Sequence, residues 1–103
     1  MFLKFFSKKR KWYEPKDPTP REQCPCCDYF GLPERGNYLI CNVCFWEDDG
    51  SDIDDLDNYG PNKCSLRDAR KNFTKFGACE ERLIPYVCSQ EERKKYKYIK
   101  REI

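Results

Sequence analysis

Hydrophobic residues in this chain occur in short groups between polar stretches, and one group repeats at helical spacing. Leu66, Ala69, Phe73 and Phe76 fall on one face of a helix. Ser65 precedes them as a residue that can cap the first turn, and Gly77 follows where a glycine commonly ends a helix. The pattern predicts a helix from Ser65 to Gly77 whose apolar face packs on the core. We expect its basic side chains to point away: Arg67, Arg70, Lys71 and Lys75.

A weaker helical pattern occupies the end of the chain. Ser89 and Glu92 have the spacing of a capping box, and Tyr96, Ile99 and Ile103 then recur on one side. Lys and Arg residues surround them. The pattern predicts a second helix, forming a basic amphipathic tail.

A third group of hydrophobic residues has the pattern of a short β-hairpin. Tyr38, Leu39 and Ile40 lead into Cys41, and Phe45 and Trp46 follow Cys44. Gly31, Pro33 and Gly36 stand before this group and favour turns. We therefore expect a hairpin that carries the second of two cysteine pairs.

The two cysteine pairs are CxxC motifs, Cys24/Cys27 and Cys41/Cys44, with thirteen residues between them. Two such turns facing one another supply four thiolates in the tetrahedral arrangement that structural zinc prefers. The alternatives are reduced core thiols and a dithiol redox motif, and the latter would need an exposed pair beside a βαβ pattern, which is missing. We predict one structural zinc ion in a small α+β fold, a four-cysteine zinc ribbon with a short β-hairpin packed against one or two helices.

The other four cysteines have no CxxC partner of their own. Cys26 lies between two predicted ligands, where it is either a spare thiol shaped by the turn or a substitute ligand. Cys64, Cys79 and Cys88 fit buried small apolar side chains better than a second metal site.

The composition indicates how many domains the chain forms and in which cellular compartment it works. The chain has 103 residues, 37% of them charged, so it forms one domain in which a metal would supply much of the stability. Eight cysteines could also mean a secreted disulfide framework, but the N-terminal apolar run is too short for a signal peptide, and no run is long enough to span a membrane. We expect a cytoplasmic protein.

Charge divides the chain into three parts. Residues 1–21 form a basic segment with a proline-rich linker, residues 22–88 a zinc-ribbon domain, and residues 89–103 a basic helix or tail. Phe2, Leu3, Phe5 and Phe6 form an apolar cluster in the first part that either folds back on the core or contacts another molecule. Between positions 22 and 90 there are seven basic and thirteen acidic residues, which favours a positively charged partner.

The acidic residues are densest just after the second cysteine pair. A calcium site is one interpretation, although the order of residues is not that of an EF-hand. A solvated loop is another, and a protein-binding face with aromatic anchors is the third. The predicted face comprises Trp46, Glu47, Asp48, Asp49, Asp52, Asp54, Asp55, Asp57 and Tyr59.

The motifs together resemble the bacterial cysteine-rich CPCC family. The resemblance is carried by Cys24-Pro25-Cys26-Cys27, by Cys41-x-x-Cys44-Phe45-Trp46-Glu47-Asp48-Asp49-Gly50, by Gly60-Pro61-Asn62 and by the segment from Ser65 to Cys79. Asn42 stands where a proline is expected, which loses turn rigidity but no ligand. The resemblance implies metal binding and a likeness to immunity proteins encoded beside bacterial toxins.

Two classes of function are compatible with a small metal-stabilised domain, namely binding and catalysis. The chain has no histidine, and a zinc ion held by four thiolates has no open position for water, so we expect no enzyme activity. We predict a protein-binding module that neutralises a bacterial toxin, such as a nuclease with a basic cleft, through the acidic face. The alternative is a zinc ribbon that binds nucleic acid through its basic ends, with Trp12, Tyr13, Tyr96 and Tyr98 available for stacking.

Overall fold

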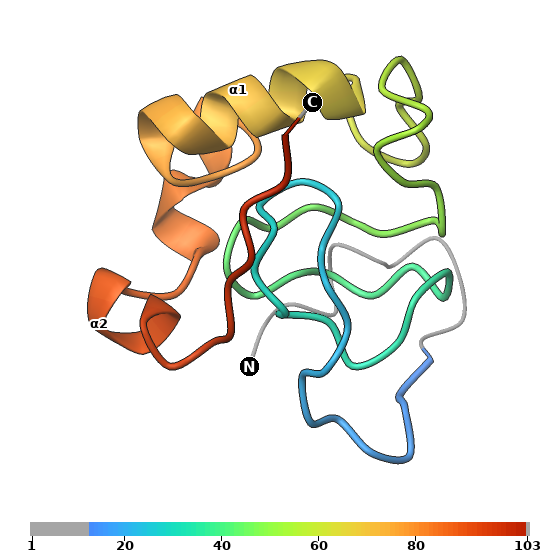
Figure 1. The fold of residues 1–103 in the computed structure, drawn as a ribbon, viewed down its shortest axis with the longest axis vertical. Helices are drawn as coiled ribbons and strands as arrows, with labels where there is room; N and C mark the ends of the chain where they lie inside the picture. The colour runs from blue at the N-terminus through green and yellow to red at the C-terminus, as the bar shows by residue number, and fades with distance from the viewer. Residues whose placement is uncertain (1–12, 103) are drawn as a thin grey trace.

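The computed structural model describes residues 13–102, and the helical elements lie in the second half of the chain (Figure 1). They are α1 (Leu66–Phe76), the 3-10 helix η2 (Glu81–Tyr86) and α2 (Gln90–Arg93). Residues 13–65 consist of turns, loops and isolated bridges (Figure 1). The predicted cluster of Phe2, Leu3, Phe5 and Phe6, together with Trp12 and Ile103, lies outside the described residues.

The predicted helix with the strongest pattern is confirmed as α1. The Ser65 hydroxyl accepts a hydrogen bond from the backbone N–H of Asp68, and Gly77 ends the helix with a φ of 79°. Leu66 and Ala69 are buried, while Phe73 packs at the edge of the core. The helix therefore follows from its caps and its apolar face, as the sequence indicates.

The predicted β-hairpin is not present as a pair of strands. Within residues 13–102 the pairing is confined to isolated bridges, and the bridge in this region joins Ile40 to Glu47. Tyr38 and Phe45 have φ angles of 61° and 72°, which lie in the left-handed region and cannot continue a strand. The turn around the second cysteine pair thus replaces the expected hairpin, and the fold has little β-structure.

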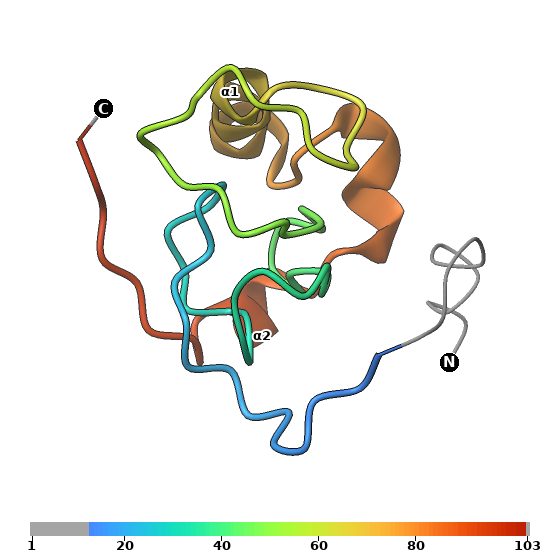
Figure 2. The ribbon, with the colours of Figure 1, turned by 90° about the vertical axis from the view of Figure 1, so that its right-hand side faces the viewer.

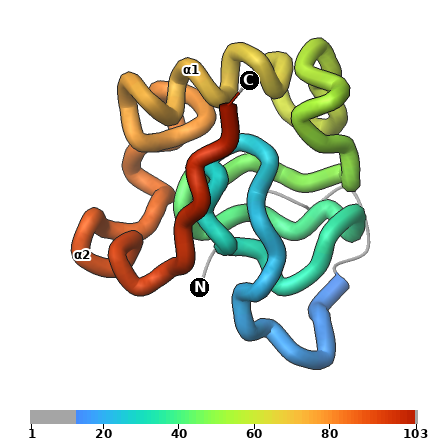
Figure 3. Tube along the Cα trace, in the orientation of Figure 1, coloured from blue at the N-terminus to red at the C-terminus, as the bar shows by residue number. Residues whose placement is uncertain are grey.

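The predicted C-terminal helix is much shorter than expected. The Ser89 hydroxyl accepts from the backbone N–H of Glu92 as the capping pattern predicts, but α2 covers only four residues. Beyond it the chain is extended and lies beside residues 28–30, directly after the first cysteine pair (Figures 2 and 3). The backbone N–H of Phe30 donates to the carbonyl of Lys97 at 2.8 Å, and Tyr29 bridges Tyr98. This pairing uses backbone groups that a continued helix would need.

The core is built on the cysteine pairs. Its buried side chains include Leu32, Val43 and Trp46 from the loops, Leu66 from α1 and Leu83 from η2, and η2 packs beside α1. No helix of the described residues is long and apolar enough to cross a membrane. The fold is a small loop-rich body with few helices, and the four cysteines of the two pairs are buried within it.

Candidate metal centre

The two CxxC pairs form the same kind of turn. The backbone N–H of Asp28 donates to the carbonyl of Cys24 at 3.0 Å, and the N–H of Phe45 donates to the carbonyl of Cys41 at 2.8 Å. Asp28 and Phe45 each follow the second cysteine of a pair, and both have a positive φ, 69° and 72°. The chain thus makes two equivalent knuckles, each reversing at a left-handed residue directly after its second cysteine.

The sulfur atoms of the two knuckles meet in the interior. The Sγ atoms of Cys24, Cys27, Cys41 and Cys44 all lie within 4.8 Å of one another, and all four residues are buried. Cys24 and Cys44 are 3.6 Å apart at sulfur, and Cys27 and Cys41 are 3.8 Å apart. A tetrahedral ion with metal–sulfur bonds near 2.3 Å requires sulfur separations of about 3.8 Å. The predicted ligand set therefore comes together with a spacing that fits a tetrahedral metal ion.

The thiols interact strongly with one another. Burial raises the pKa of Cys27 and of Cys44. Hydrogen bonds with the neighbouring thiols raise the pKa of Cys44 further, and at Cys27 those with Cys24 and Cys41 raise it while the one with Cys44 lowers it. At Cys41 burial also acts to raise the pKa, but hydrogen bonds with Cys24, Cys27 and Cys44 outweigh it and the pKa is lowered. The four thiols therefore affect one another's pKa values. A metal cation would replace the thiol protons and stabilise the thiolates, which makes the site suitable for a metal ion.

The remaining cysteines do not join this set. Cys26 is buried, and burial raises its pKa, while its backbone N–H donates to the Cys24 sulfur at 3.4 Å. Burial raises the pKa of Cys64 to about 11, and it also raises the pKa values of Cys79 and Cys88. Within residues 13–102 no second group of metal ligands is present. Cys79 is buried as predicted, whereas Cys64 and Cys88 are only partly buried and pack against the core.

A buried carboxylate, Asp28, supports the first knuckle from outside the ligand set. Arg70 of α1 donates to both of its oxygens, at 2.8 and 2.9 Å, and Arg101 donates its backbone N–H and its Nε, both at 2.9 Å. Burial acts to raise the pKa of Asp28, but the hydrogen bonds from the two arginines outweigh it and the pKa is lowered. The prediction that Arg70 points away from the body is therefore wrong.

The same arginines hold the backbone of the first knuckle. Arg70 donates to the carbonyl of Pro25 at 2.6 Å, and Arg101 donates to the carbonyl of Cys24 at 3.2 Å. Arg101 also donates to Asp52 at 3.0 Å, which links the first knuckle to the loop after the second. The sequence gives no direct signal for these contacts, because they join residues far apart in the chain.

Arg35 continues the network behind the second knuckle. It donates to both oxygens of Asp48, at 2.9 and 3.0 Å, and to Asp52 at 2.9 Å. Asp48 is fully buried and also accepts from the backbone N–H of Gly36 at 2.8 Å. Trp46 is 2% exposed. Asp48 and Trp46 therefore lie in the interior and cannot contact a partner, which corrects their assignment to the predicted acidic face.

The other residues of the predicted face differ in exposure. Asp54, Asp55, Asp57 and Tyr59 are exposed, whereas Glu47, Asp49 and Asp52 are partly buried. Asp49 accepts from the Ser51 hydroxyl at 2.6 Å and from Asn58 at 3.1 Å, so it closes the loop on itself. The accessible part of the face is thus residues 54–59, which we call the acidic loop.

Comparison with known proteins identifies one match. The model of a family described as cysteine-rich CPCC matches residues 22–94, which confirms the resemblance seen in the motifs. No curated protein and no solved structure matches the chain. The matched region contains both knuckles, α1, η2 and α2.

Proposed function

The chain belongs to the cysteine-rich CPCC family, and from this premise we propose that it is a zinc-stabilised protein-binding module without catalytic activity. The observation that carries the proposal is the close spacing of four buried sulfur atoms in a chain that also displays an exposed acidic loop after the second knuckle. In this proposal the metal holds the loops in place, and the surface that they display binds the partner.

Zinc is the metal that this donor set favours. Four thiolates in a tetrahedral arrangement select zinc or iron–sulfur chemistry over hard cations, and structural zinc is typically four-coordinate with two CxxC pairs. The sulfur separations of 3.6 and 3.8 Å support a single ion. Bound zinc would add roughly 10–16 kcal/mol of apparent binding free energy at neutral pH to a fold with few helices.

The acidic loop is the surface that we propose for the partner. Its two sides are fixed, since Arg35 and Arg101 both hold Asp52, and Asn58 donates to Asp49 and to the Ser51 hydroxyl. Asp54 and Asp55 are exposed, and Tyr59 of the same loop is 54% exposed. A fixed loop with carboxylates and an exposed aromatic ring suits a basic protein surface, where charge steers the encounter and the ring anchors it.

The sharpest form of the proposal is an immunity protein that neutralises a cognate bacterial toxin in the cytoplasm. A toxin with nuclease activity needs a basic cleft for phosphates, and an acidic loop can occupy such a cleft in place of nucleic acid. Support for this form comes from the surplus of acidic residues between positions 22 and 90. Its partner would be a positively charged protein domain.

The experiment begins with capture of the partner by co-purification from the native cell, followed by measurement of its affinity for purified variants. We expect Asp54→Lys/Asp55→Lys to weaken binding at least tenfold without loss of zinc. The matched control is Glu22→Lys/Glu81→Lys, which makes the same charge change at two exposed residues outside the loop. Unchanged affinity of the loop variant, or equal loss in the control, would remove the acidic loop from the proposal.

Nucleic-acid binding through the basic ends is the second candidate. The observation in its favour is that Lys94, Lys95, Lys97 and Lys100 are all exposed on the C-terminal segment. We rank it second because Arg70 and Arg101, the cations nearest the first knuckle, are already paired with Asp28. A salt-sensitive shift of an oligonucleotide that disappears after removal of residues 1–21, or after replacement of Lys94, Lys95, Lys97 and Lys100 by Gln, would reverse the ranking.

A further inference from the structure

The chain after α2 is extended, and one edge of residues 97–101 pairs with the residues that follow the first knuckle. We call residues 97–101 the edge segment. The backbone N–H of Phe30 donates to the Lys97 carbonyl at 2.8 Å. The backbone N–H of Ile99 donates to the Asp28 carbonyl at 3.4 Å. Lys97 and Ile99 thus direct backbone hydrogen-bonding groups toward this neighbour.

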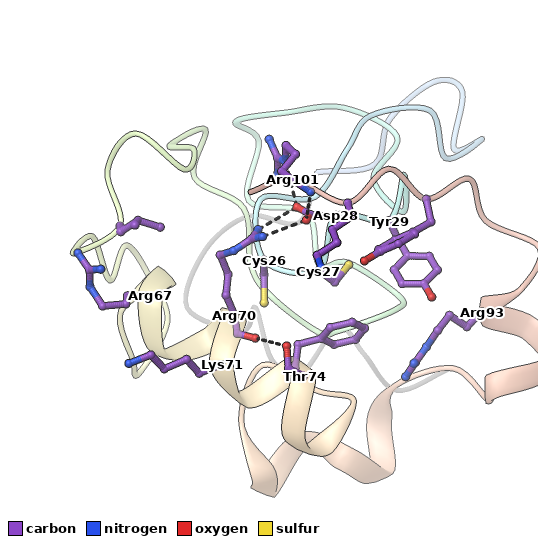
Figure 4. A pocket seen from close by; sticks show the side chains of 14 residues that line it. Cys26, Cys27, Asp28, Tyr29, Arg67, Arg70, Lys71, Thr74, Arg93 and Arg101 are labelled. Atoms are coloured by element: carbon purple, nitrogen blue, oxygen red, sulfur yellow. Dashed lines mark hydrogen bonds and ion pairs between the residues drawn. The ribbon is translucent and has the colours of Figure 1, made fainter. Parts of the chain in front are cut away.

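Side chains continue the same edge to its end. The side-chain amide of Gln23 donates to the Ile99 carbonyl at 2.8 Å. The backbone N–H of Arg101 donates to the Asp28 carboxylate at 2.9 Å. Figure 4 shows the side chains of Arg101 and Asp28 pointing toward one another and joined by hydrogen bonds. Every second residue of the edge segment is therefore held against the first knuckle or the residues that flank it.

The opposite edge of the segment is open. Successive residues of an extended chain present their backbone N–H and C=O groups to opposite sides. Tyr98 and Lys100 therefore direct theirs away from the first knuckle, and neither forms a backbone hydrogen bond with any residue from 13 to 102. Both residues are exposed, and the segment lies at the surface of the molecule (Figures 1 and 2). A strand from another chain can extend such an edge.

The edge segment is held in its extended form by contacts within the protein. Arg101 donates from its side chain to Asp28 at 2.9 Å and to Asp52 at 3.0 Å. The ring of Tyr98 stacks on that of Tyr29, with centroids 4.6 Å apart. An added strand would not have to order the segment, and this preorganisation favours binding.

The charges beside the open edge indicate which kind of strand it accepts. Two exposed lysines, Lys95 and Lys97, form no ion pair with any described residue, and Lys100 pairs at 3.8 Å with an exposed carboxylate, which contributes little. Opposite charges stabilise cross-strand pairs, and like charges destabilise them. A second copy of this chain would bring lysines against lysines. The edge therefore favours an acidic strand.

Each face of the edge segment also offers an apolar side chain. Because side chains alternate along an extended chain, Tyr98 shares one face with Lys100, and Ile99 shares the other with Lys97. Tyr98 and Ile99 are both 48% exposed. Aromatic and β-branched side chains of an added strand pack well on such neighbours. The strand that suits this edge therefore combines acidic residues with aromatic or β-branched ones.

We propose that the open edge of the edge segment binds an extended acidic segment of a partner protein by β-strand addition. The backbone groups of Tyr98 and Lys100 pair with the added strand, and the lysines face its carboxylates. This surface is opposite in charge to the acidic loop. The proposal does not depend on what binds the acidic loop.

The first experiment is a selection of displayed random peptides on the full chain, with peptides of about eight residues, within the usual length of a strand. We expect the bound peptides to be rich in Asp and Glu, together with Val, Ile, Thr and Tyr. The tightest of them is then synthesised, and its affinity is measured by fluorescence anisotropy. A selection that yields no peptide, or only basic peptides, would overturn the proposal.

The second experiment tests the backbone pairing. Ligation of a synthetic fragment at Cys88 allows the full chain to be made with one methylated backbone nitrogen. Methylation at Tyr98 removes an outward N–H, so it should weaken the peptide about three- to tenfold, the factor of one hydrogen bond, without lowering the free energy of unfolding. Methylation at Ile99 is the control, because it removes the bond to the Asp28 carbonyl and should lower the free energy of unfolding. Full affinity after methylation at Tyr98 would overturn strand addition.

The third experiment tests the charge. Lys97→Gln/Lys100→Gln should weaken the peptide about threefold or more, as expected for the loss of two cross-strand ion pairs. The matched control is Lys63→Gln/Lys75→Gln, which removes the same charge at exposed lysines outside the edge segment. Unchanged circular dichroism spectra will show that the variants are folded. Equal loss in both variants would mean unspecific attraction and would overturn the assignment.

Two further results would overturn the choice of an acidic protein segment. One is a dimer of the chain that disappears on methylation at Tyr98, which would assign the edge to a second copy. The other is an oligonucleotide that displaces the peptide and binds more tightly, which would assign the lysines to nucleic acid.

Discussion

Arg101 donates two hydrogen bonds to Asp28, one from its backbone N–H and one from its Nε, each 2.9 Å long. The two residues lie near opposite ends of the described chain, and Asp28 directly follows the second cysteine of the first knuckle. The C-terminal segment is thereby fastened to the proposed metal centre. The pair suggests that residues far from the cysteines in sequence determine how firmly the metal is held.

Arg101→Gln should loosen the metal centre. The variant loses the ionic hydrogen bonds to Asp28 and Asp52 and the contact with the Cys24 carbonyl. We expect the free energy of unfolding to fall by about 1.5–3 kcal/mol and zinc to be released to a chelator several times faster. Denaturant titration and stopped-flow release measure the two effects.

Lys94→Gln is the control, because the Lys94 side chain is 74% exposed and its ion pair with Glu91 contributes little to stability. Equal effects in both variants would contradict this role of Arg101.

Asp28→Asn should be more harmful than Arg101→Gln. Asparagine tolerates the left-handed backbone conformation that Asp28 adopts, so the substitution tests the charge and not the turn. It leaves Arg70 and Arg101 half-buried without their shared counter-charge, and removal of one partner of a buried pair costs about 3–5 kcal/mol. The measurement is again denaturant unfolding of the zinc-loaded protein. A loss below about 1 kcal/mol would show that the carboxylate charge is unimportant.

Gly31→Ala should disturb a ligand directly. A Cβ atom at position 31 would lie 2.9 Å from the Cys41 sulfur, and a sulfur fixed by a metal ion cannot move aside easily. We expect zinc affinity to fall by about 10–100-fold, the range found when groups that support metal ligands are changed. Competition with a chromophoric chelator measures it. Wild-type affinity in the variant would mean that the Cys41 sulfur does not occupy its observed position when the metal is bound.

Lowering the pH should release the metal ion, and this release should precede unfolding of the protein. Metal-bound cysteines must be thiolates, so each ligand takes up a proton on release and the apparent affinity falls as the pH falls. Burial raises the pKa values of the metal-free Cys27 and Cys44 thiols, which favours the protonated form and strengthens this dependence. Zinc content measured after dialysis between pH 8 and pH 4 should therefore decrease toward low pH. Affinity independent of pH would exclude ligation by thiolates.

Local sequence patterns predicted the cysteine knuckles and α1 because short-range physics determines them. The CxxC spacing sets each turn, and Ser65, Asp68 and Gly77 cap the helix within its own sequence. The spacing alone predicts the four ligands. The structure brings their sulfur atoms together as expected.

Long-range contacts account for the parts that the sequence did not predict. The capping signal at Ser89 is real, but pairing of residues 97–99 with residues 28–30 ends the helix after Arg93. Arg70 and Asp48 look like ordinary surface charges in the sequence, and only their partners Asp28 and Arg35 explain their burial. The sequence alone does not distinguish an exposed aromatic anchor from a core residue at Trp46, because large aromatic residues dominate both interfaces and cores; the structure places it in the core.

Metal analysis of a cysteine-to-serine series tests the central claim most directly. Full-length protein purified without added metal is assayed for zinc per chain, together with single serine variants at all eight cysteines. The account predicts about one zinc per chain in the wild type and in the Cys26, Cys64, Cys79 and Cys88 variants, with marked loss at Cys24, Cys27, Cys41 and Cys44. Zinc well below one per chain in the wild type, with all thiols free to react, would contradict it.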